Sequence, residues 1–119
     1  MPVRSLDSSV LTWPDRNAVH QAVRRWAERS ARVRGGVRRI GYFGSYARGD
    51  WGVGSDVDLL VIVSASAHPF ERRAIEWDAT DLPVPADVLV YTEEEWASLR
   101  GRRFHDSVMR EAVWVWPPA

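Results

Sequence analysis

The first pattern along the chain is helical. Apolar residues between residues 12 and 34 recur every three or four positions, which predicts an amphipathic helix. These apolar residues are Val19, Ala22, Val23, Trp26 and Ala27. Thr12 stands ahead of Trp13-Pro14-Asp15 and is the expected cap of the helix, with a proline in its first turn. Gly35-Gly36 is a strong breaker and predicts that the helix ends near Arg34.

Further along, short apolar runs alternate with polar stretches. The runs predict strands at residues 37–43, 56–64, 84–91 and 112–116. The stretches between them predict helices at residues 45–49, 69–78, 92–100 and 104–111. The third of these helices opens with a capping box formed by Thr92 and Glu95. Because strands alternate with helices, we expect an α/β layered fold.

The composition fits one compact domain. With 119 residues, 45% of them hydrophobic, we expect a single domain over residues 1–119. The absence of cysteine excludes a disulfide framework and a thiolate metal site. No apolar run approaches the roughly 20 residues of a membrane span, and the first residues lack a signal-peptide pattern, so we expect a cytoplasmic protein without a membrane partner. A formal net charge of zero argues against nucleic acid as a partner.

Two carboxylates, Asp56 and Asp58, stand at the start of the second apolar run. Residues i and i+2 of a strand project from the same face, so we expect both side chains to point together. Two carboxylates held this close repel each other unless a cation lies between them. Hard oxygen ligands of this kind suit Mg²⁺ or Mn²⁺ better than zinc. The alternative is a solvated turn in which Ser55 or Asp56 only caps the loop.

A third carboxylate, Asp87, interrupts the apolar run at residues 84–91. An unpaired carboxylate is costly in the interior, so a neighbouring strand is expected to bring Asp87 beside Asp56 and Asp58. The alternatives are an exposed strand edge or an ion pair with an arginine. Asp78 and Asp81 are rival third ligands, although they lie in less regular sequence.

Gly44 and Ser45 precede the two carboxylates and predict an anion site. A glycine lets the backbone approach a ligand closely, and the start of the following helix offers free N–H groups. The Ser45 hydroxyl adds one more donor, and Arg48, one helical turn further on, is placed to face the same anion. A Gly-Ser pair alone usually marks a turn, and its value here comes from lying just before Asp56 and Asp58.

Together these segments resemble a known pattern. Residues 44–49 (GSYARG), a five-residue spacer and residues 55–61 (SDVDLLV) are similar to the nucleotidyltransferase superfamily, in which Gly-Ser precedes Asp-x-Asp on the next strand. The A-R-G after Gly-Ser resembles the minimal nucleotidyltransferase (MNT) branch, and the resemblance extends over nearly the whole chain. It implies the nucleotidyltransferase fold, a small mixed β-sheet flanked by helices. Trp51, where the branch commonly has a small residue, and the unusual spacer Gly52-Val53-Gly54 are departures that affect the nucleotide pocket but not the metal ligands.

The resemblance implies transfer of a nucleoside monophosphate from an NTP, here ATP, to a hydroxyl group. Asp56 and Asp58 would hold two Mg²⁺ ions, one bound to the triphosphate. The other ion, together with Asp87 as metal ligand and general base, would activate the attacking hydroxyl. Ser45 and the Gly44 backbone would hold the β- and γ-phosphates. These implied roles define the catalytic, metal and cofactor-binding residues that we test against the structure.

Three functions follow from the resemblance. The first is an antitoxin that transfers AMP to a tyrosine of a HEPN-domain ribonuclease toxin, its partner in a two-gene pair. The second is a binding module that neutralises a toxin without catalysis, although a pure binder does not need three carboxylates and a Gly-Ser turn. The third is an aminoglycoside nucleotidyltransferase that acts with a partner subunit.

Several other residues allow two interpretations. Tyr46 is expected to pack against the sheet rather than stack on a base. Trp114 and Trp116 alternate along the last strand and either join the core or form a partner surface. Arginines crowd the first helix and its exit, at Arg24, Arg25, Arg29, Arg32, Arg34, Arg38 and Arg39. We interpret this basic cluster as a solvated helix face rather than a site for RNA or an acidic partner.

Overall fold

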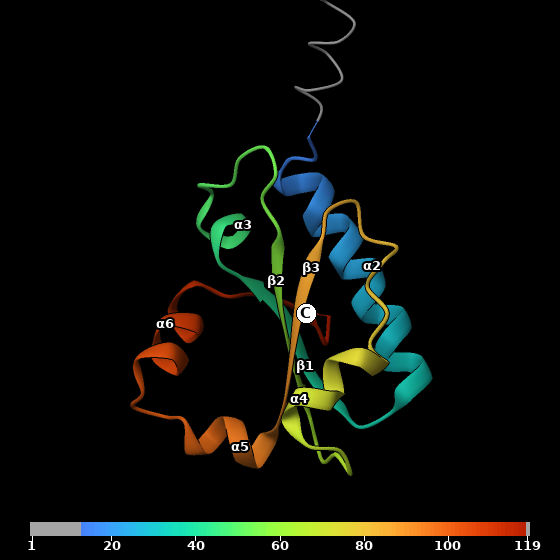
Figure 1. The fold of residues 1–119 in the computed structure, drawn as a ribbon, viewed down its shortest axis with the longest axis vertical. Helices are drawn as coiled ribbons and strands as arrows, with labels where there is room; N and C mark the ends of the chain where they lie inside the picture. The colour runs from blue at the N-terminus through green and yellow to red at the C-terminus, as the bar shows by residue number, and fades with distance from the viewer. Residues whose placement is uncertain (1–12, 119) are drawn as a thin grey trace, which may run out of the picture.

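The computed structural model describes residues 13–118, which form a four-stranded sheet with helices on both faces (Figure 1). The strands are β1 (Val37–Phe43), β2 (Val57–Val63), β3 (Ala86–Thr92) and β4 (Val113–Trp116). The helices are α2 (Arg16–Arg34), α3 (Ser45–Arg48), α4 (Phe70–Arg73), α5 (Glu93–Ser98) and α6 (Arg103–Glu111), with a 3₁₀ turn η1 (Ala74–Glu76). The mixed α/β architecture agrees with the predicted fold class.

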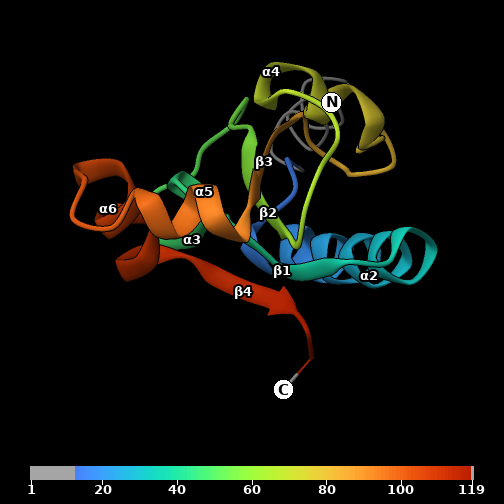
Figure 2. The ribbon, with the colours of Figure 1, turned by 90° about the horizontal axis from the view of Figure 1, so that it is seen from below.

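The sheet is mixed, with the strand order β3-β2-β1-β4. β1 runs antiparallel to both β2 and β4, whereas β2 and β3 are parallel. Figure 2 shows β4 and α4 at opposite edges of this sheet. β3 and β4 are therefore the edge strands, and β2 lies inside the sheet.

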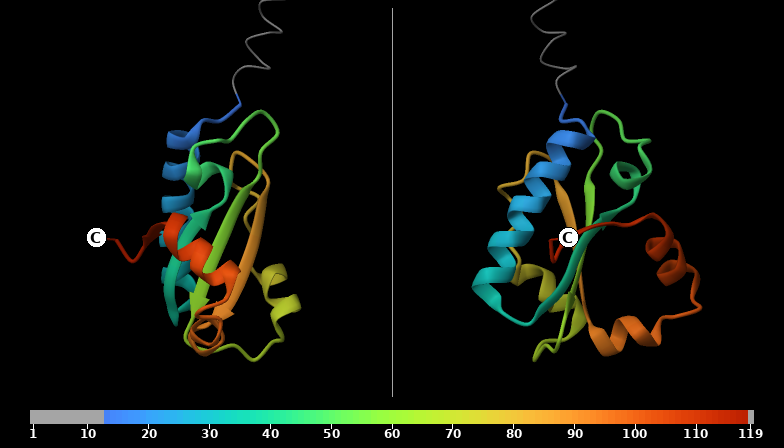
Figure 3. Two further views of the ribbon diagram at one scale, coloured as in Figure 1. Left: turned by 90° about the vertical axis from the view of Figure 1, so that its left-hand side faces the viewer. Right: turned by 180° about the vertical axis from the view of Figure 1, so that it is seen from behind.

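β2 is buried on both faces, as its continuous apolar sequence predicts. Val57, Leu59 and Val61 pack into one cluster with residues of α2, and Leu60 and Ile62 pack into a second cluster with α5 and α6. Figure 3 shows α2 on one face of the sheet and α5 and α6 on the other. The polar residue Asp58 therefore stands at the start of the most buried strand of the fold.

α2 begins at a different residue from the one predicted. Asp15 is the N-cap, and its carboxylate accepts a hydrogen bond of 2.9 Å from the Ala18 amide. Thr12, the predicted cap, lies outside the described residues. An aspartate caps a helix as well as a threonine does, so both residues near Pro14 were possible N-caps. The helix ends at Arg34, as predicted.

Residues 69–78 do not form the single helix that was predicted. They form α4 and then η1, after which Trp77 adopts an extended conformation. This conformation brings the Trp77 ring within 5.9 Å of the Trp26 ring, and the Arg34 guanidinium lies 4.2 Å from the Trp77 ring centre. Core packing of one tryptophan therefore ends the helix early.

Tyr46 packs in the core, as predicted, whereas Trp114 and Trp116 are only partly buried. Tyr46 is fully buried, and its hydroxyl donates to the Pro14 carbonyl at 2.9 Å, which confirms packing. Trp114 and Trp116 do not share one environment: Trp114 packs against the cluster of α5 and α6, and Trp116 against the cluster of α2. The pairing of β1 with β4 shifts register between Ile40 and Gly41, and this irregularity turns the two rings differently.

Four of the seven arginines in the basic cluster form ion pairs with neighbouring carboxylates. Ion pairs join Arg29 to Asp81, Arg32 to Glu28, Arg34 to Glu76 and Arg38 to Glu93. These contacts support the interpretation of a solvated face. Within residues 13–118, no helix combines the length and the apolar character that crossing a membrane requires.

One buried charge joins α4 to α5. Arg73 is only 6% exposed, and its guanidinium forms a two-pronged contact with the Glu95 carboxylate. Glu95 also closes the predicted capping box by accepting the Thr92 amide at 2.9 Å. The hydrogen bond from Arg73 lowers the pKa of Glu95 from 4.5 to about 2. Burial acts in the opposite direction, and the hydrogen bond from the Thr92 amide lowers the pKa further.

This shift predicts an acid-sensitive contribution to stability. Because the pKa is lower in the folded state, the contribution is fully present above about pH 4.5 and is lost as the pH falls towards 2. Glu95→Gln keeps an oxygen for the Thr92 amide but loses the charge. We expect the variant to be less stable than the wild type in urea at pH 7, and the difference to shrink between pH 4.5 and 2.

The control is Glu94→Gln, which removes an exposed carboxylate from the same helix. Surface carboxylates contribute little, so its unfolding midpoint should follow that of the wild type at each pH. A Glu95→Gln difference that stays constant with pH would contradict the ionic role of Glu95.

Candidate active site

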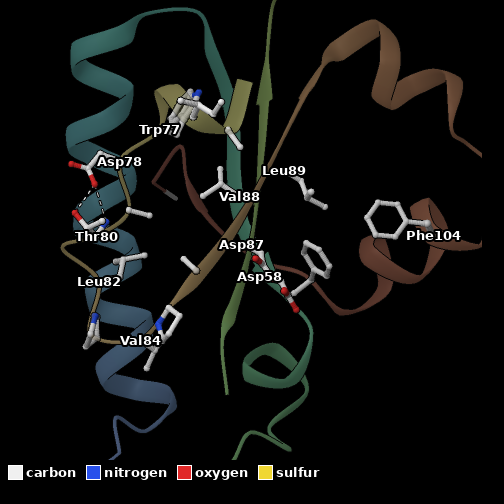
Figure 4. A pocket seen from close by; sticks show the side chains of 17 residues that line it. Asp58, Trp77, Asp78, Thr80, Leu82, Val84, Asp87, Val88, Leu89 and Phe104 are labelled. Atoms are coloured by element: carbon white, nitrogen blue, oxygen red, sulfur yellow. Dashed lines mark hydrogen bonds between the residues drawn. The ribbon is translucent and has the colours of Figure 1, made fainter. Parts of the chain in front are cut away.

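Asp58 and Asp87 lie side by side on neighbouring strands. The parallel register of β2 and β3 pairs Asp58 with Asp87, and registered residues of adjacent strands project from the same face of a sheet. Figure 4 shows both carboxylates together in the wall of one pocket. The predicted approach of Asp87 to Asp58 is therefore present in the fold.

The prediction that Asp56 lies on the same strand as Asp58 is wrong. β2 begins at Val57, so Asp56 belongs to the exposed segment before it. The preceding residue, Ser55, has a structural role, because its hydroxyl accepts the Gly52 amide at 2.8 Å and closes the loop. The solvated-turn interpretation thus holds for Ser55, while Asp56 still lines the same pocket as Asp58 and Asp87.

Gly44 is in direct contact with Asp58. β1 and β2 pair Phe43 with Asp58, so the turn that follows Phe43 lies beside this carboxylate. Gly44 has φ 79° and ψ −153°, a conformation that is essentially restricted to glycine. A Cβ atom at Gly44 would collide with Oδ2 of Asp58. The glycine is needed for both its backbone angles and its missing side chain.

The electrostatics of the pocket disfavour the charged form of Asp58. Burial raises the pKa of Asp58, and the charges of Asp87, Asp56 and Glu111 raise it further, while Arg48 acts in the opposite direction. The protein alone thus supplies too little positive charge for this group of acids. A bound cation would relieve the repulsion.

Glu111 is a residue of this pocket that the sequence analysis missed. Its Oε1 accepts the Gly44 amide at 2.9 Å and the Arg48 Nη1 at 3.5 Å. It stands at the end of α6, 67 positions from Gly44, in a segment where the sequence analysis singled out no site residue. Only the packing of α6 beside the sheet reveals it.

All six predicted site residues line a single pocket of about 490 Å³. They are Gly44, Ser45, Arg48, Asp56, Asp58 and Asp87. The rival carboxylates do not line this pocket: Asp78 binds the hydroxyl and amide of Thr80, and Asp81 pairs with Arg29. Asp87 is thus the third carboxylate that the fold brings to the pair.

Comparison with protein families agrees with this geometry. The model of the nucleotidyltransferase domain matches residues 23–115, which include all six predicted site residues. The chain belongs to the nucleotidyltransferase family. A comparison with curated protein sequences gives no match.

Two solved structures share the nucleotidyltransferase fold. A Sulfolobus solfataricus protein described as a nucleotidyltransferase aligns with a TM-score of 0.62 and 20% identity, over 85% of this chain and 82% of the other. A chain from the crystal structure of a toxin-antitoxin with AMP-PNP aligns with a TM-score of 0.55 and 20% identity, over 78% of this chain and 72% of the other. At this identity the likeness concerns the fold.

The donor set of this nucleotidyltransferase pocket fits a hard divalent cation. Three aspartates supply only carboxylate oxygens, the ligands that Mg²⁺ prefers, and Gly44 leaves space against one of them. Within residues 13–118, no three His, Asp or Glu side chains are already gathered around one ion position. Asp58 and Asp87 are the two carboxylates that the register of the sheet places side by side, and Asp56 lines the same pocket from the exposed segment before β2.

Proposed function

We propose that this nucleotidyltransferase transfers AMP from ATP to a hydroxyl group of a partner protein, with two Mg²⁺ ions bound by Asp56, Asp58 and Asp87. The observation that carries the proposal is the pairing of Asp58 with Asp87 beside the Gly44–Ser45 turn, in a chain of this family. The repulsion within the acidic group also supports it, because a site with no cation to bind would gain nothing from such repulsion.

The reaction that we propose is a displacement at the α-phosphorus. The acceptor oxygen forms a bond to this phosphorus, and the bond to the bridging oxygen of the β-phosphate breaks, so pyrophosphate leaves. The hydroxyl proton passes to the Asp87 carboxylate, which is exposed and therefore accessible to an acceptor. When bound, the metal ions would neutralise the charge on the phosphates and lower the pKa of the hydroxyl.

Ser45 and Arg48 are the residues that we propose for the phosphates. Ser45 is the first residue of α3, and Arg48 follows one turn later, so both side chains line the pocket beside Asp58. The Arg48 side chain is half exposed and already bound to the carboxylates of Asp50 and Glu111. A bound triphosphate would replace these carboxylates as the anionic partner of the Arg48 guanidinium.

The partner that we propose is a HEPN-domain ribonuclease toxin, modified on a tyrosine in the cytoplasm. The likeness in fold to a chain of a toxin-antitoxin structure with AMP-PNP supports a toxin partner and an adenine nucleotide. The acceptor would then be a side chain of the toxin, which agrees with the exposed position of Asp87.

The test is a transfer assay with the protein encoded by the adjacent gene. The two proteins are incubated with Mg²⁺ and with ATP, CTP, GTP or UTP labelled at the α-phosphate. We expect the label to pass from ATP to a tyrosine of the second protein, and EDTA to abolish the transfer. A toxin that is neutralised without acquiring label would favour the second candidate, a binding module that acts through complex formation alone.

A further inference from the structure

The free edge of β3 forms the floor of a second, larger groove. Within residues 13–118, β3 pairs only with β2 and ends the sheet. The groove has a volume of about 1280 Å³. It continues from the pocket of the three aspartates and shares Phe43, Asp58, Asp87 and Phe104 with it. Figure 4 shows β3 crossing the groove, with Phe104 on one side and Trp77 and Leu82 on the other.

The backbone groups of every second residue of β3 face this groove. Val57 is registered with Ala86, and its amide donates to the Pro85 carbonyl at 2.9 Å. In a parallel ladder with this register, residues 85, 87, 89 and 91 bond to β2, and residues 86, 88, 90 and 92 point the other way. Outward groups on an edge strand are a template for another strand.

At the C-terminal end of β3, side chains already form hydrogen bonds with the outward-facing backbone groups. The Val90 carbonyl accepts Nη1 of Arg73 at 3.1 Å, and the Thr92 amide donates to Glu95 at 2.9 Å. Both contacts confirm that even-numbered residues face outwards. By contrast, the N–H and C=O of Val88 have no hydrogen-bond partner within residues 13–118. The unsatisfied part of the edge is thus the part next to Asp87.

The walls of the groove are apolar and acidic. The ionisable residues that line it are Asp58, Asp78 and Asp87, and no arginine or histidine is among the lining residues. Ile75, on the wall formed by η1, is 84% exposed, and Val88 and Leu89 are half-buried on the floor. This surface suits an occupant with apolar side chains and at least one positive charge.

We propose that this groove binds an extended segment of the acceptor protein, which adds to β3 as a fifth strand and carries a basic residue close to the reacting hydroxyl. This inference rests on the proposed function, and it adds how the acceptor protein binds to the nucleotidyltransferase. An added strand would satisfy the N–H and C=O of Val88. It would lie about 4.8 Å from β3, which brings the side chain opposite Asp87 within reach of this carboxylate.

The alternation of side chains makes the proposal more specific. Asp87 and Leu89 project to the face covered by α5 and α6, whereas Val88 projects to the face covered by α2. Asp78 belongs to the second side, because its carbonyl accepts the indole N–H of Trp26 at 2.8 Å. The hydroxyl residue of the segment would face Asp87, and a basic residue at an odd offset from it would face Asp78.

The probe for this inference is a library of random peptides of about 12 residues, long enough for an added strand. We expect the wild-type protein, without nucleotide, to select peptides with a hydroxyl residue and with Arg or Lys at odd offsets from it. Binding should slow hydrogen exchange at the Val88 amide. Val88→Pro removes the outward N–H without touching the ladder to β2 and should weaken binding about 10-fold.

Val88→Thr is the matched control, because it keeps the N–H and the branched shape, and it should bind as the wild type does. The inference is overturned if no peptide is selected, if Val88→Pro binds normally, or if ATP alone slows exchange at Val88, which would place the nucleotide in the groove. Should Val88→Pro fail to unfold cooperatively, Asp78→Asn replaces it. Compared with the wild type, this variant must then bind cationic peptides at least about threefold more weakly, and its affinity must depend less on the salt concentration.

The peptide measurements use no nucleotide, so they separate the two proposals. Peptide binding that is intact in a protein without transferase activity would count against the proposed function. Transfer to the partner that is unaffected by Val88→Pro would count against the groove.

Discussion

Asp58→Asn is expected to reduce transfer of AMP to the partner by about 100- to 1000-fold or more, the scale of losing one charged group that stabilises a transition state. Asp58 is the residue on which the site converges, because it pairs with Asp87 across β2 and β3 and touches Gly44. An amide of the same shape keeps the packing but cannot balance a divalent cation. The measurement is the rate of label transfer from ATP.

The fold of Asp58→Asn should be intact and slightly more stable. Burial and neighbouring acids raise the pKa of Asp58, so its charge opposes folding at neutral pH, and a neutral amide removes this opposition. Mg²⁺ should raise the melting temperature of the wild type but not that of the variant. Asp81→Asn, which changes an exposed carboxylate paired with Arg29, is the control and should keep full activity. Undiminished transfer by Asp58→Asn would refute the assignment.

Gly44→Ala is expected to lower transfer by about 100-fold, the scale of a displacement of about 1 Å in a reacting site. The added methyl group would collide with Oδ2 of Asp58, so the carboxylate has to move. The backbone angles of Gly44, φ 79° and ψ −153°, are also costly for alanine, by about 1–3 kcal/mol. Both the rate of transfer and the melting temperature should fall.

Gly49→Ala separates these two effects. Gly49 also has a positive φ, 89°, but a Cβ atom there would meet nothing within 4 Å. Its left-handed conformation costs alanine about 1 kcal/mol, so the variant should lose stability while keeping its rate of transfer. Equal loss of activity in both variants would mean that backbone strain, rather than the displacement of Asp58, is responsible.

The sequence predicted the central features of the site because they depend on local chemistry. The aspartate in the apolar run of β3 is exposed on an edge strand, as the alternative interpretation had it, and the register with β2 places it beside Asp58 as well. The Gly44–Ser45 turn was expected between β1 and the carboxylates, and it lies there. Strand β1 was predicted with its observed bounds, because its apolar residues and the glycines on either side of it indicate the same start and end.

The remaining features depend on contacts between distant segments, which no local pattern encodes. Glu111 joins the pocket only because α6 packs beside the turn at Gly44. The helical segment of α4 and η1 ends at Glu76, and the next residue, Trp77, packs against Trp26, 51 positions earlier in the chain. Asp56 fell outside β2 because the strand begins one residue later than the alternation predicted. In each case a tertiary contact or a strand boundary overrode a reasonable local expectation.

Glu111 has one further consequence for the pocket. Its carboxylate occupies the Gly44 amide and one nitrogen of Arg48, two donors that suit an oxyanion. Under the proposed function, it would act as an internal stand-in for a phosphate and would keep both donors aligned before a nucleotide binds. A phosphate that used these donors would first have to displace the side chain at the end of α6. The contact that preorganises the turn would therefore also weaken the binding of competing anions.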